Sequence, residues 1–567
     1  MEYTSADYYY DDIRRCLTTT QYDIRRRCSM AYRLFVELMN ETTADAPASF
    51  SGAFSRLHYL HAQRGFSDTL YHAANDFRVR WRRADELTET QLTDRLPGDL
   101  RALADLVAGL KQAPVPAELA ALLPRHLTAV ESPKPLSEKC LRVVVDAVLS
   151  HELTVSPTDA GGDTEFQLPL APDAAGGRDF RYLLALVEPG MQLNLVAVRR
   201  EGHRLFPELV ILEPDYLVNV TAIAQCIART GTCSEWNVLK KFDPFVTSQH
   251  TLLGSLSGQM LDEEVHGLEA GYADTARRFF SDHALEFAAC DFDRQEFHAQ
   301  AQQQQRNLRH LSQNTFKHQL HLSDEEGVCI EPSFFCEMLG LQGRIDLMKP
   351  DGSVVLEQKS GKIDEYNRTA HREHELQLML YMAMRHYVFG QSYSRLQGYL
   401  LYSRYADERS IWPIPNAPER LREAFRLRNE IVAREEQFAR TGMRDFIAQL
   451  TPDQLHRPGQ ADPLWNKYKR PQVETLLAPF HTADPTALAY FYRFHRFLVR
   501  ENLLSRFGSS GKEASGFAAA WQCTTDEKRE VGSILTDLRL LSTETDESGH
   551  GVKHLHLALP DTDPNGE

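Results

Sequence analysis

Residues 339–381 constrain the fold of this chain more than any other stretch, because they predict a hairpin with charged residues at defined places. Two apolar runs flank residues 349–352, where proline and glycine supply the dihedral angles that a chain reversal needs. Asp346 lies near the end of the first run, and Glu357 and Lys359 lie two residues apart in the second. Side chains alternate across a strand, so Glu357 and Lys359 share a face, and pairing about the turn brings Asp346 close to Glu357.

These three charges predict a particular chemistry. Two carboxylates that share space are costly unless a cation lies between them, and Lys359 supplies one positive charge. A hard divalent cation such as Mg²⁺ would supply the rest through oxygen ligands, and it could polarise a phosphodiester and activate a water molecule. The alternative is an ordinary solvated hairpin. Three apolar residues directly before Glu357 favour a largely buried strand, namely Val354, Val355 and Leu356.

A helix is expected over residues 369–389, because apolar residues recur there at helical spacing. Gln377 and Tyr381 are four residues apart and therefore share one face, with His374 on the same side. The helix therefore follows the strand of Glu357 and Lys359 in sequence and carries polar side chains of its own on one face.

Taken together, these motifs resemble those of a known family. Gly343 and Asp346 form G-x-x-D, residues 357–362 form E-x-K-S-G-K, and Gln377 and Tyr381 form Q-x-x-x-Y. This combination resembles the RecB-type branch of the PD-(D/E)XK nucleases, and the likeness covers about 150 residues, from near Gly254 to Tyr402. That branch includes the RecB nuclease domain, the CRISPR adaptation exonucleases and the nuclease half of the eukaryotic Okazaki-fragment helicase-nuclease. The string around both strands is most similar to the helicase-nuclease group.

The resemblance implies a role for each matching residue. Asp346 and Glu357 would be metal ligands together with the backbone carbonyl of Gln358, and Lys359 would be the catalytic lysine. Gln377 and Tyr381 would position the scissile strand or steady the lysine. The expected DNA-binding residues are Lys362, Arg368 and Arg372. The expected cofactor is Mg²⁺ or Mn²⁺.

The first metal ligand departs from the family pattern. Relatives often carry a histidine four residues after a glycine in the first helix of the core, which is expected around residues 252–264. Counting from Gly254 places Gly258 there, and counting from Gly258 places Asp262 there. Glycine has no ligand atom on a side chain, whereas an aspartate suits Mg²⁺, so Asp262 is the preferred candidate. A solvated helix acid is the alternative.

Some relatives also hold an iron–sulfur cluster on four cysteines, three of which follow the core. Only Cys523 follows Tyr381 in this chain, so no such cluster is expected. The nine cysteines are scattered and odd in number, as is typical of reduced thiols in a cytoplasmic protein.

Length and pattern predict a multi-domain α+β protein, because 567 residues exceed one compact core. The expected parts are a helical N-terminal region (1–130), a β-rich, barrel-like module (131–218), a RecB-like PD-(D/E)XK, restriction-endonuclease-like core (219–405) and a helical C-terminal region (406–567). No apolar run is long enough for a membrane span, and no signal peptide is expected. The net charge of −16 argues weakly against a general nucleic-acid coat but leaves room for a locally basic cleft.

Several further patterns have two readings. Arginines cluster at residues 25–27 and 78–83, where a phosphate-binding surface is the alternative to the more common solvated helix face.

The glutamine run at 302–305 is expected to be a polar helix face. The aromatic stripe at 487–501 is expected to be core rather than a platform for bases. Residues 508–513 fail as an ATP-binding loop, since Glu513 stands where Ser or Thr would bind Mg²⁺.

The resulting expectation is a Mg²⁺- or Mn²⁺-dependent deoxyribonuclease that acts on single-stranded, flapped or end-exposed DNA. A separate or fused helicase is the expected partner, in DNA repair, recombination or antiviral defence. Two alternatives remain open: a catalytically weak DNA-end-binding subunit of a helicase complex, and an RNA-directed nuclease.

Overall fold

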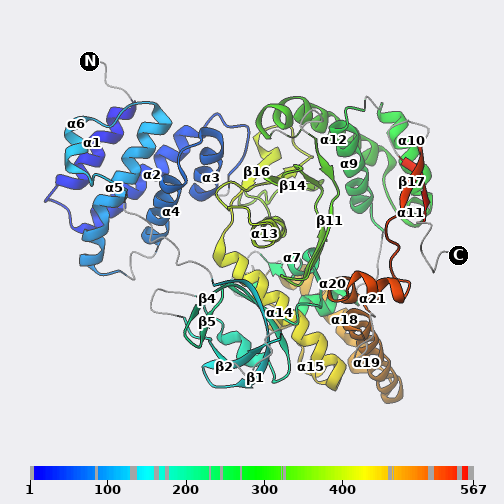
Figure 1. Cartoon of the computed structure of the whole chain (residues 1–567). Helices are drawn as coiled ribbons and strands as arrows, with labels where there is room; N and C mark the ends of the chain where they lie inside the picture. Colours follow the sequence, from blue (N-terminus) through cyan, green and yellow to red (C-terminus); the bar gives the residue numbers. More distant parts are fainter. Residues whose placement is uncertain are drawn as a thin grey trace.

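A computed structural model of the chain shows helical and β-rich parts arranged around a central mixed sheet (Figure 1). It describes residues 5–50, 52–82, 87–127, 137–158, 165–172, 178–228, 231–242, 247–268, 271–320, 322, 327–456, 463, 465–508, 516–545 and 552–559. No helix among these residues is long and apolar enough to cross a membrane.

The N-terminal part is a bundle of helices with its own apolar core. Its helices are α1 (Ser5–Thr18), α2 (Ile24–Thr42), α3 (Ala53–Arg64), α4 (Asp68–Arg82), α5 (Glu89–Lys111) and α6 (Ala117–Leu122). Helix α5 begins with a capping box, in which Thr88 and Gln91 satisfy each other's free backbone N–H groups. The bundle reaches the central sheet through Ser49, whose N–H donates to the Ile411 carbonyl oxygen at 2.8 Å.

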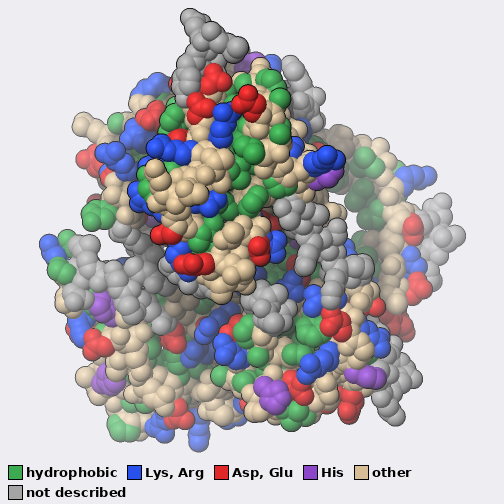
Figure 2. Space-filling model, turned by 90° about the vertical axis from the view of Figure 1, so that its left-hand side faces the viewer, with side chains coloured by type: hydrophobic (Ala, Val, Ile, Leu, Met, Phe, Trp, Pro, Cys, Tyr) green, Lys and Arg blue, Asp and Glu red, His purple; other side chains and the backbone are tan. Residues whose placement is uncertain are grey.

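The two arginine clusters of this bundle are occupied by structural contacts. Arg27 donates to the carbonyl oxygens of Cys16 and Leu17, and Arg80 pairs with the buried Asp99. Arg78 is buried over the ring of Phe54. Basic and acidic side chains are interspersed on the face of the molecule that includes the bundle (Figure 2). These arginines therefore stabilise the helices, whereas Arg83 lies outside the described residues.

A closed β-barrel follows the bundle. Its strands are β1 (Glu138–Val148), β2 (Glu152–Pro157), β3 (Phe166–Pro169), β4 (Gln192–Glu201) and β5 (Arg204–Phe206); β6 (Leu209–Leu212) adds to β4, and the short 3₁₀ helix η2 (Arg181–Ala185) precedes β4. The N-terminal half of β1 pairs with β4 and its C-terminal half with β2. A register shift between Val145 and Ala147 marks a bulge, which bends β1 enough to close the ring. With β3 and β5 parallel, the barrel has the small, Greek-key architecture of OB-folds.

A short connecting segment leads from the barrel to the core. It comprises β7 (Val218–Asn219), α7 (Val220–Ala224), β8 (Ile227–Ala228), β9 (Gly231–Thr232) and α8 (Glu235–Lys240). Strand β7 pairs in parallel with β12 of the core, so the segment is part of the packing around the sheet.

Helices precede the central sheet in sequence and cover one side of it (Figure 1). They are α9 (Gln249–Val265), α10 (Tyr272–Asp282), α11 (Ala284–Ala289), α12 (Arg294–Leu311) and the π-helical segment η3 (Ser312–Leu320). Ser248 caps α9 in a capping box with Thr251, which sets the start of the helix.

The central sheet has the strand order β10-β13-β14-β15-β16, and β11 pairs with β12 beside it. The elements are β10 (Cys329–Ile330), β11 (Ser333–Cys336), β12 (Leu341–Arg344), β13 (Leu347–Met348), β14 (Val354–Lys359), α13 (Arg372–Tyr387), β15 (Gln397–Tyr402), η4 (Glu408–Ser410) and β16 (Ile411–Ile414). Helix α13 is buried on nearly all sides, as expected for a helix enclosed by a domain. Strand β16 extends the sheet beyond the boundary expected at residue 405.

The predicted hairpin is confirmed, since Leu347 pairs with Leu356 and Met348 with Val355 in antiparallel fashion. The first apolar run differs from the expected single strand. It is divided into β12 and β13, which pair with β11 and β10, respectively. Asp346 lies in the break between the two strands, where its backbone oxygen accepts from the N–H of Glu331 at 2.9 Å.

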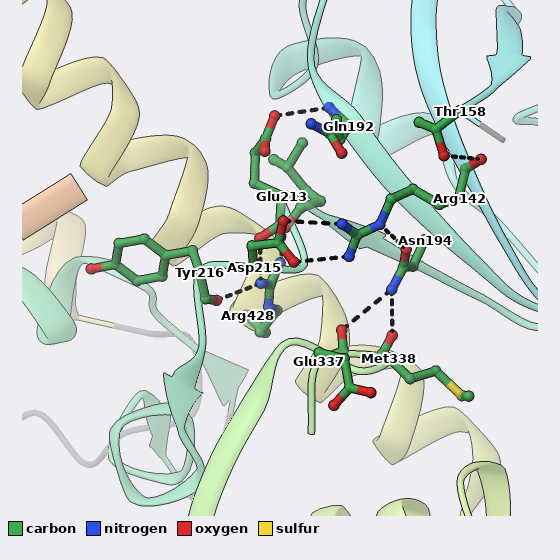
Figure 3. A network of polar contacts seen from close by, with 11 residues as sticks. Arg142, Thr158, Gln192, Asn194, Glu213, Asp215, Tyr216, Glu337, Met338 and Arg428 are labelled. Atoms are coloured by element: carbon green, nitrogen blue, oxygen red, sulfur yellow. Dashed lines mark hydrogen bonds and ion pairs between the residues drawn. The ribbon is translucent and has the colours of Figure 1, made fainter. Parts of the chain in front are cut away.

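A buried arginine joins the barrel to helix α14 (Pro418–Thr441) and to the core. Arg428 is fully buried and donates to the carbonyl oxygens of Leu212, Glu213, Tyr216 and Gly340. Figure 3 shows its contact with Tyr216. Burial lowers the pKa of its guanidinium to about 9. Nearby, Arg142 of the barrel binds Asp215 through two hydrogen bonds of 2.9 and 3.0 Å, and Asn194 donates to backbone carbonyls of the core.

The C-terminal part is mainly helical but ends in a two-stranded hairpin, which the expectation of a helical region missed. Its elements are α15 (Arg444–Gln449), α16 (Pro452–Leu455), η5 (Trp465–Lys469), α18 (Arg470–Thr482), α19 (Pro485–Phe507), α20 (Ala519–Gln522), α21 (Thr525–Glu530), β17 (Arg539–Thr545) and β18 (Val552–Ala558). The glycine-rich residues 509–513 lie outside the described residues.

Candidate active site

The candidate active site forms where β14 ends against helix α13. Glu357 is 3% exposed, and its Oε1 accepts hydrogen bonds from Lys359 Nζ at 2.8 Å and from Gln377 Nε2 at 2.6 Å. Lys359 Nζ also donates to Gln377 Oε1 at 3.0 Å. The ammonium group is therefore held between a carboxylate and an amide that are themselves hydrogen-bonded. The structure brings together three of the side chains that the sequence singled out.

Asp346 joins this group through the backbone of the neighbouring strand. Its Oδ2 accepts from the N–H of Gln358 at 2.6 Å. The backbone N–H of Ser403, just after β15, donates to the carbonyl oxygen of Lys359. Because the backbone groups of successive residues point to opposite edges of a strand, those of Gln358 point away from β15 and toward Asp346. The backbone carbonyl of Gln358 thus lies on the same edge of β14 as its N–H, which contacts Asp346.

Both carboxylates are harder to ionise than usual when no metal is bound. Burial is the main cause for each, and it raises the pKa of Glu357 to about 7 despite the opposing effect of Lys359. The pKa of Asp346 is also raised by burial, against the effects of the Gln358 N–H and Lys359. The Oε2 atom of Glu357 is buried and has no hydrogen-bond partner. A buried carboxylate oxygen without a partner is costly, and a bound cation would satisfy it.

Asp262 of helix α9 faces the same group. Burial, together with the negative charges of Glu331 and Asp346, raises its pKa to about 7. Gly258, the other candidate position, has open space around its α-carbon. Within the described part of the chain, no three His, Cys, Asp or Glu side chains converge into a ready-made metal site. Asp262, Asp346 and Glu357 offer oxygen atoms, which suit a hard cation. These three side chains would have to move closer to one another to bind it.

Tyr381 follows Gln377 by one helical turn and interacts with its side chain. Its hydroxyl donates to the carbonyl oxygen of Arg344 at 2.8 Å, and it makes no hydrogen bond to Lys359. A Cβ added at Gly343 would lie 2.8 Å from the tyrosine ring, so only glycine leaves room for this approach. Tyr381 therefore supports the backbone that leads into Asp346. His374 also turns away from the carboxylates, and its Nδ1 lies 2.9 Å from the hydroxyl of Tyr402.

The three expected DNA-binding residues lie on or next to the loop after β14. Lys362 is exposed and pairs with Glu365 at 3.0 Å, and Arg372 pairs with Glu423 of α14 at 2.6 Å. Arg368 is exposed and lines a cleft of about 680 Å³ with residues of the N-terminal bundle. None of the three has a hydrogen bond to the carboxylate group among the contacts of the described residues.

A buried polar network beneath the site was missed from the sequence. Gln304 is 2% exposed, accepts from the Ser403 hydroxyl at 2.7 Å and donates to the Ser360 carbonyl at 3.2 Å. Ser257 of α9 bonds to the side chain of Gln358 at 2.7 Å and to Ser403 at 3.0 Å. The interpretation of residues 302–305 as a polar helix face is therefore wrong for Gln304. The available signal was its spacing from Ala301 and Leu308, which places it within the apolar stripe of the helix.

Comparison with known protein families agrees with this geometry. Residues 246–460 match a family model described as PD-(D/E)XK nuclease superfamily. This part of the chain is a PD-(D/E)XK nuclease superfamily domain. The match contains every residue of the candidate active site and extends past β16 into the helices that follow the sheet. No curated protein matches the chain.

Proposed function

We propose that the chain is a divalent-metal-dependent deoxyribonuclease that hydrolyses DNA with a single-stranded end or flap. The observation that carries the proposal is the buried Oε2 atom of Glu357, which lacks a partner while Asp346 and Lys359 lie beside it. Membership of residues 246–460 in a nuclease superfamily supports phosphodiester hydrolysis as the reaction.

The residues that would hold Mg²⁺ or Mn²⁺ are Asp346, Glu357 and the backbone carbonyl of Gln358, with Asp262 as a further carboxylate. All are oxygen donors, which both cations prefer. When bound, such a metal polarises the phosphodiester and lowers the pKa of a water molecule.

Lys359 performs the remaining chemistry in this proposal. Glu357 and Gln377 fix its ammonium group, so it can orient the attacking water or offset negative charge on the phosphate. Gln377 acts as a positioning residue for Lys359. Tyr381 acts further away, by supporting the backbone between Arg344 and Asp346.

The test compares wild type with Lys359→Ala on 5′- and 3′-labelled flapped DNA in Mg²⁺, Mn²⁺ or EDTA. We expect metal-dependent cutting by wild type and a loss of at least about a thousandfold in the variant, because an electrostatic group at a reacting centre is removed. Circular dichroism should show an unchanged fold.

Lys349→Ala is the matched control, since Lys349 lies at the turn of the same hairpin and away from the carboxylates. It should cut like wild type. Near-wild-type cleavage by Lys359→Ala in Mg²⁺ would refute the assignment of the site.

A second candidate function is a DNA-end-binding subunit that cuts poorly. It is favoured by the aspartate at position 262, where relatives often have histidine, and by the finding that no three acidic, histidine or cysteine side chains of the described residues already converge on a metal site. Binding of flapped DNA without cutting in either metal would favour this function. Cutting of a matched RNA in preference to DNA would instead favour an RNA-directed nuclease. A helicase partner, in repair or defence, rests on the family resemblance and belongs to the same proposal.

A further inference from the structure

Helix α19 has an aromatic face that packs inside the protein and a second one that does not. Phe491 and His495 contact the ring of Phe242, and Val499 is buried. The expectation that the whole stripe is core is wrong for the other face. Tyr490, Phe494 and Phe497 are 69%, 48% and 53% exposed, respectively. Three large rings thus lie at the surface of one well-formed helix.

The exposed rings form a regular ladder. Tyr490 and Phe494 have ring centroids 5.9 Å apart and planes only 5° from parallel, and Phe494 and Phe497 are 6.2 Å apart at 28°. Adjacent bases of duplex DNA are about 3.4 Å apart along each strand. The spacing of the rings is therefore suited to bases that have separated from one another, as in an extended single strand.

Two arginines flank one edge of this ladder. Arg493 and Arg500 are seven residues apart, two helical turns, and both are exposed. No ion pair or hydrogen bond of either side chain is found among the described residues. Glu501 is exposed one helical turn after Phe497, so the two arginines outnumber one carboxylate there, in a chain with a net charge of −16. The other two arginines of the helix, Arg496 and Arg506, donate to the backbone carbonyls of Ala439 and Leu217.

We propose that the outer face of α19, defined as Tyr490, Arg493, Phe494, Phe497 and Arg500, binds single-stranded nucleic acid. Bases stack on the three rings and backbone phosphates pair with the two arginines, which is the combination that sequence-tolerant single-strand binding uses. That the strand is DNA rests on the function proposed above, but binding to this face does not require cleavage.

The charge and shape of the face favour this ligand over others. A duplex hides its bases from the rings, and an acidic peptide would pair with the arginines but leave most of the ring surface without a partner. Exposed aromatic rings and arginines also occur at protein interfaces. The test therefore separates the contribution of the bases from that of the phosphates.

The experiment measures binding of a fluorescein-labelled 20-nucleotide dT strand by anisotropy, with the full chain in EDTA to prevent cutting. The ring variant Tyr490→Ala/Phe494→Ala/Phe497→Ala should bind at least about tenfold more weakly, given the energy of stacking one base on one ring. Wild type should discriminate against an abasic strand of equal length, and the ring variant should not. Arg493→Ala/Arg500→Ala should flatten the slope of log Kd against log salt by about 1.4.

Leu285→Ala and Arg277→Ala are matched controls, since both side chains are more than three-quarters exposed on other helices. They should bind like wild type, and circular dichroism should show that the ring variant is folded. Wild-type affinity in the ring variant would overturn the inference, and so would equal affinity of wild type for the abasic strand. Failure of wild type to cut DNA in Mg²⁺ would instead count against the nuclease function and leave this binding result intact.

Discussion

Lys359 is held by two neighbours of different kinds. Glu357 gives its ammonium group a charged partner at 2.8 Å, and Gln377 gives it a neutral one at 3.0 Å. Because Gln377 also donates to Glu357, the three side chains form a closed triangle. An ammonium group in such a triangle is restrained without being fully neutralised, which leaves charge available to a phosphate.

The protonation of Glu357 predicts a pH dependence of stability. Its pKa is about 7 in the folded protein and near 4.5 when unfolded, so the folded state binds more protons between these values. This contribution to stability is fully present below about pH 4.5 and is lost as the pH rises through 7. In EDTA, we expect the difference in unfolding free energy between pH 5 and pH 8 to be smaller in Glu357→Gln than in wild type, by up to about 3 kcal/mol.

Urea unfolding of both proteins at several pH values measures this difference. The glutamine cannot titrate but keeps nearly the same shape, so the comparison cancels all other titrating groups. Parallel pH profiles for the two proteins would show that Glu357 does not ionise in this range.

Metal addition should reverse the effect at high pH. A cation that binds only the folded state stabilises it by about 2.7 kcal/mol when present at a hundred times its Kd. We expect Mn²⁺ to raise the melting temperature of wild type at pH 8, more than at pH 5, because its ligands must be deprotonated. Asp346→Asn should show little response, and an equal response in this variant would exclude Asp346 as a ligand.

At the scale of secondary-structure elements, local patterns predicted much of the site. The turn at residues 349–352 and the two-residue period of β14 were sufficient to place Glu357 and Lys359 on one face near Asp346. Helical spacing was sufficient to place Gln377 toward them. The target of Tyr381 could not be predicted, because its partner is a backbone carbonyl 37 residues away. The role of Gln304 also depends on a strand end, at Ser403, that lies far along the chain.

Two buried side chains of helix α14 bind strand β6. Asn429 accepts from the N–H of Leu212 and donates to the carbonyl oxygen of Val210, and Arg428 reaches further, into the core. Arg428 donates to four backbone carbonyls between strand β6 and the core, and each would lose this donor in Arg428→Met. The carbonyls of Glu213 and Gly340 would keep a backbone donor. We expect a loss of about 3 kcal/mol or more in the free energy of unfolding, measured in urea. Arg428→Lys should rescue little, because an ammonium group cannot reach carbonyls spread around a planar guanidinium.

Arg426→Met is the matched control on the same helix. Its side chain is 56% exposed and pairs with Glu430 within one helical turn, so the loss should stay below about 1 kcal/mol. Equal losses in the unfolding free energy of the two methionine variants would mean that burial does not increase the contribution of Arg428 to stability.

At the scale of the whole molecule, the expectation was a β-rich, barrel-like module, without the strand pairings that close it. Closing the barrel requires β1 to pair with both β2 and β4, and the second of these pairings joins residues some 50 positions apart. The extent of the central sheet was likewise underestimated, since Trp412 and its neighbours in β16 follow the expected end of the core. The closure of the barrel depends on a distant partner rather than on local pattern, whereas β16 pairs with β15, the strand directly before it.

The N-terminal bundle contacts the edge of the central sheet through the hydrogen bond of Ser49 to Ile411. Strand β16 is the last strand of the central sheet, and an uncovered edge strand offers its free backbone groups to other molecules. We expect a truncated protein that starts at residue 131 to self-associate, as seen by light scattering, while the full chain does not. A truncated protein that stays monomeric at the same concentration would contradict this expectation. Self-association of the truncated protein alone would assign the bundle a role in protecting the nuclease-superfamily domain from aggregation.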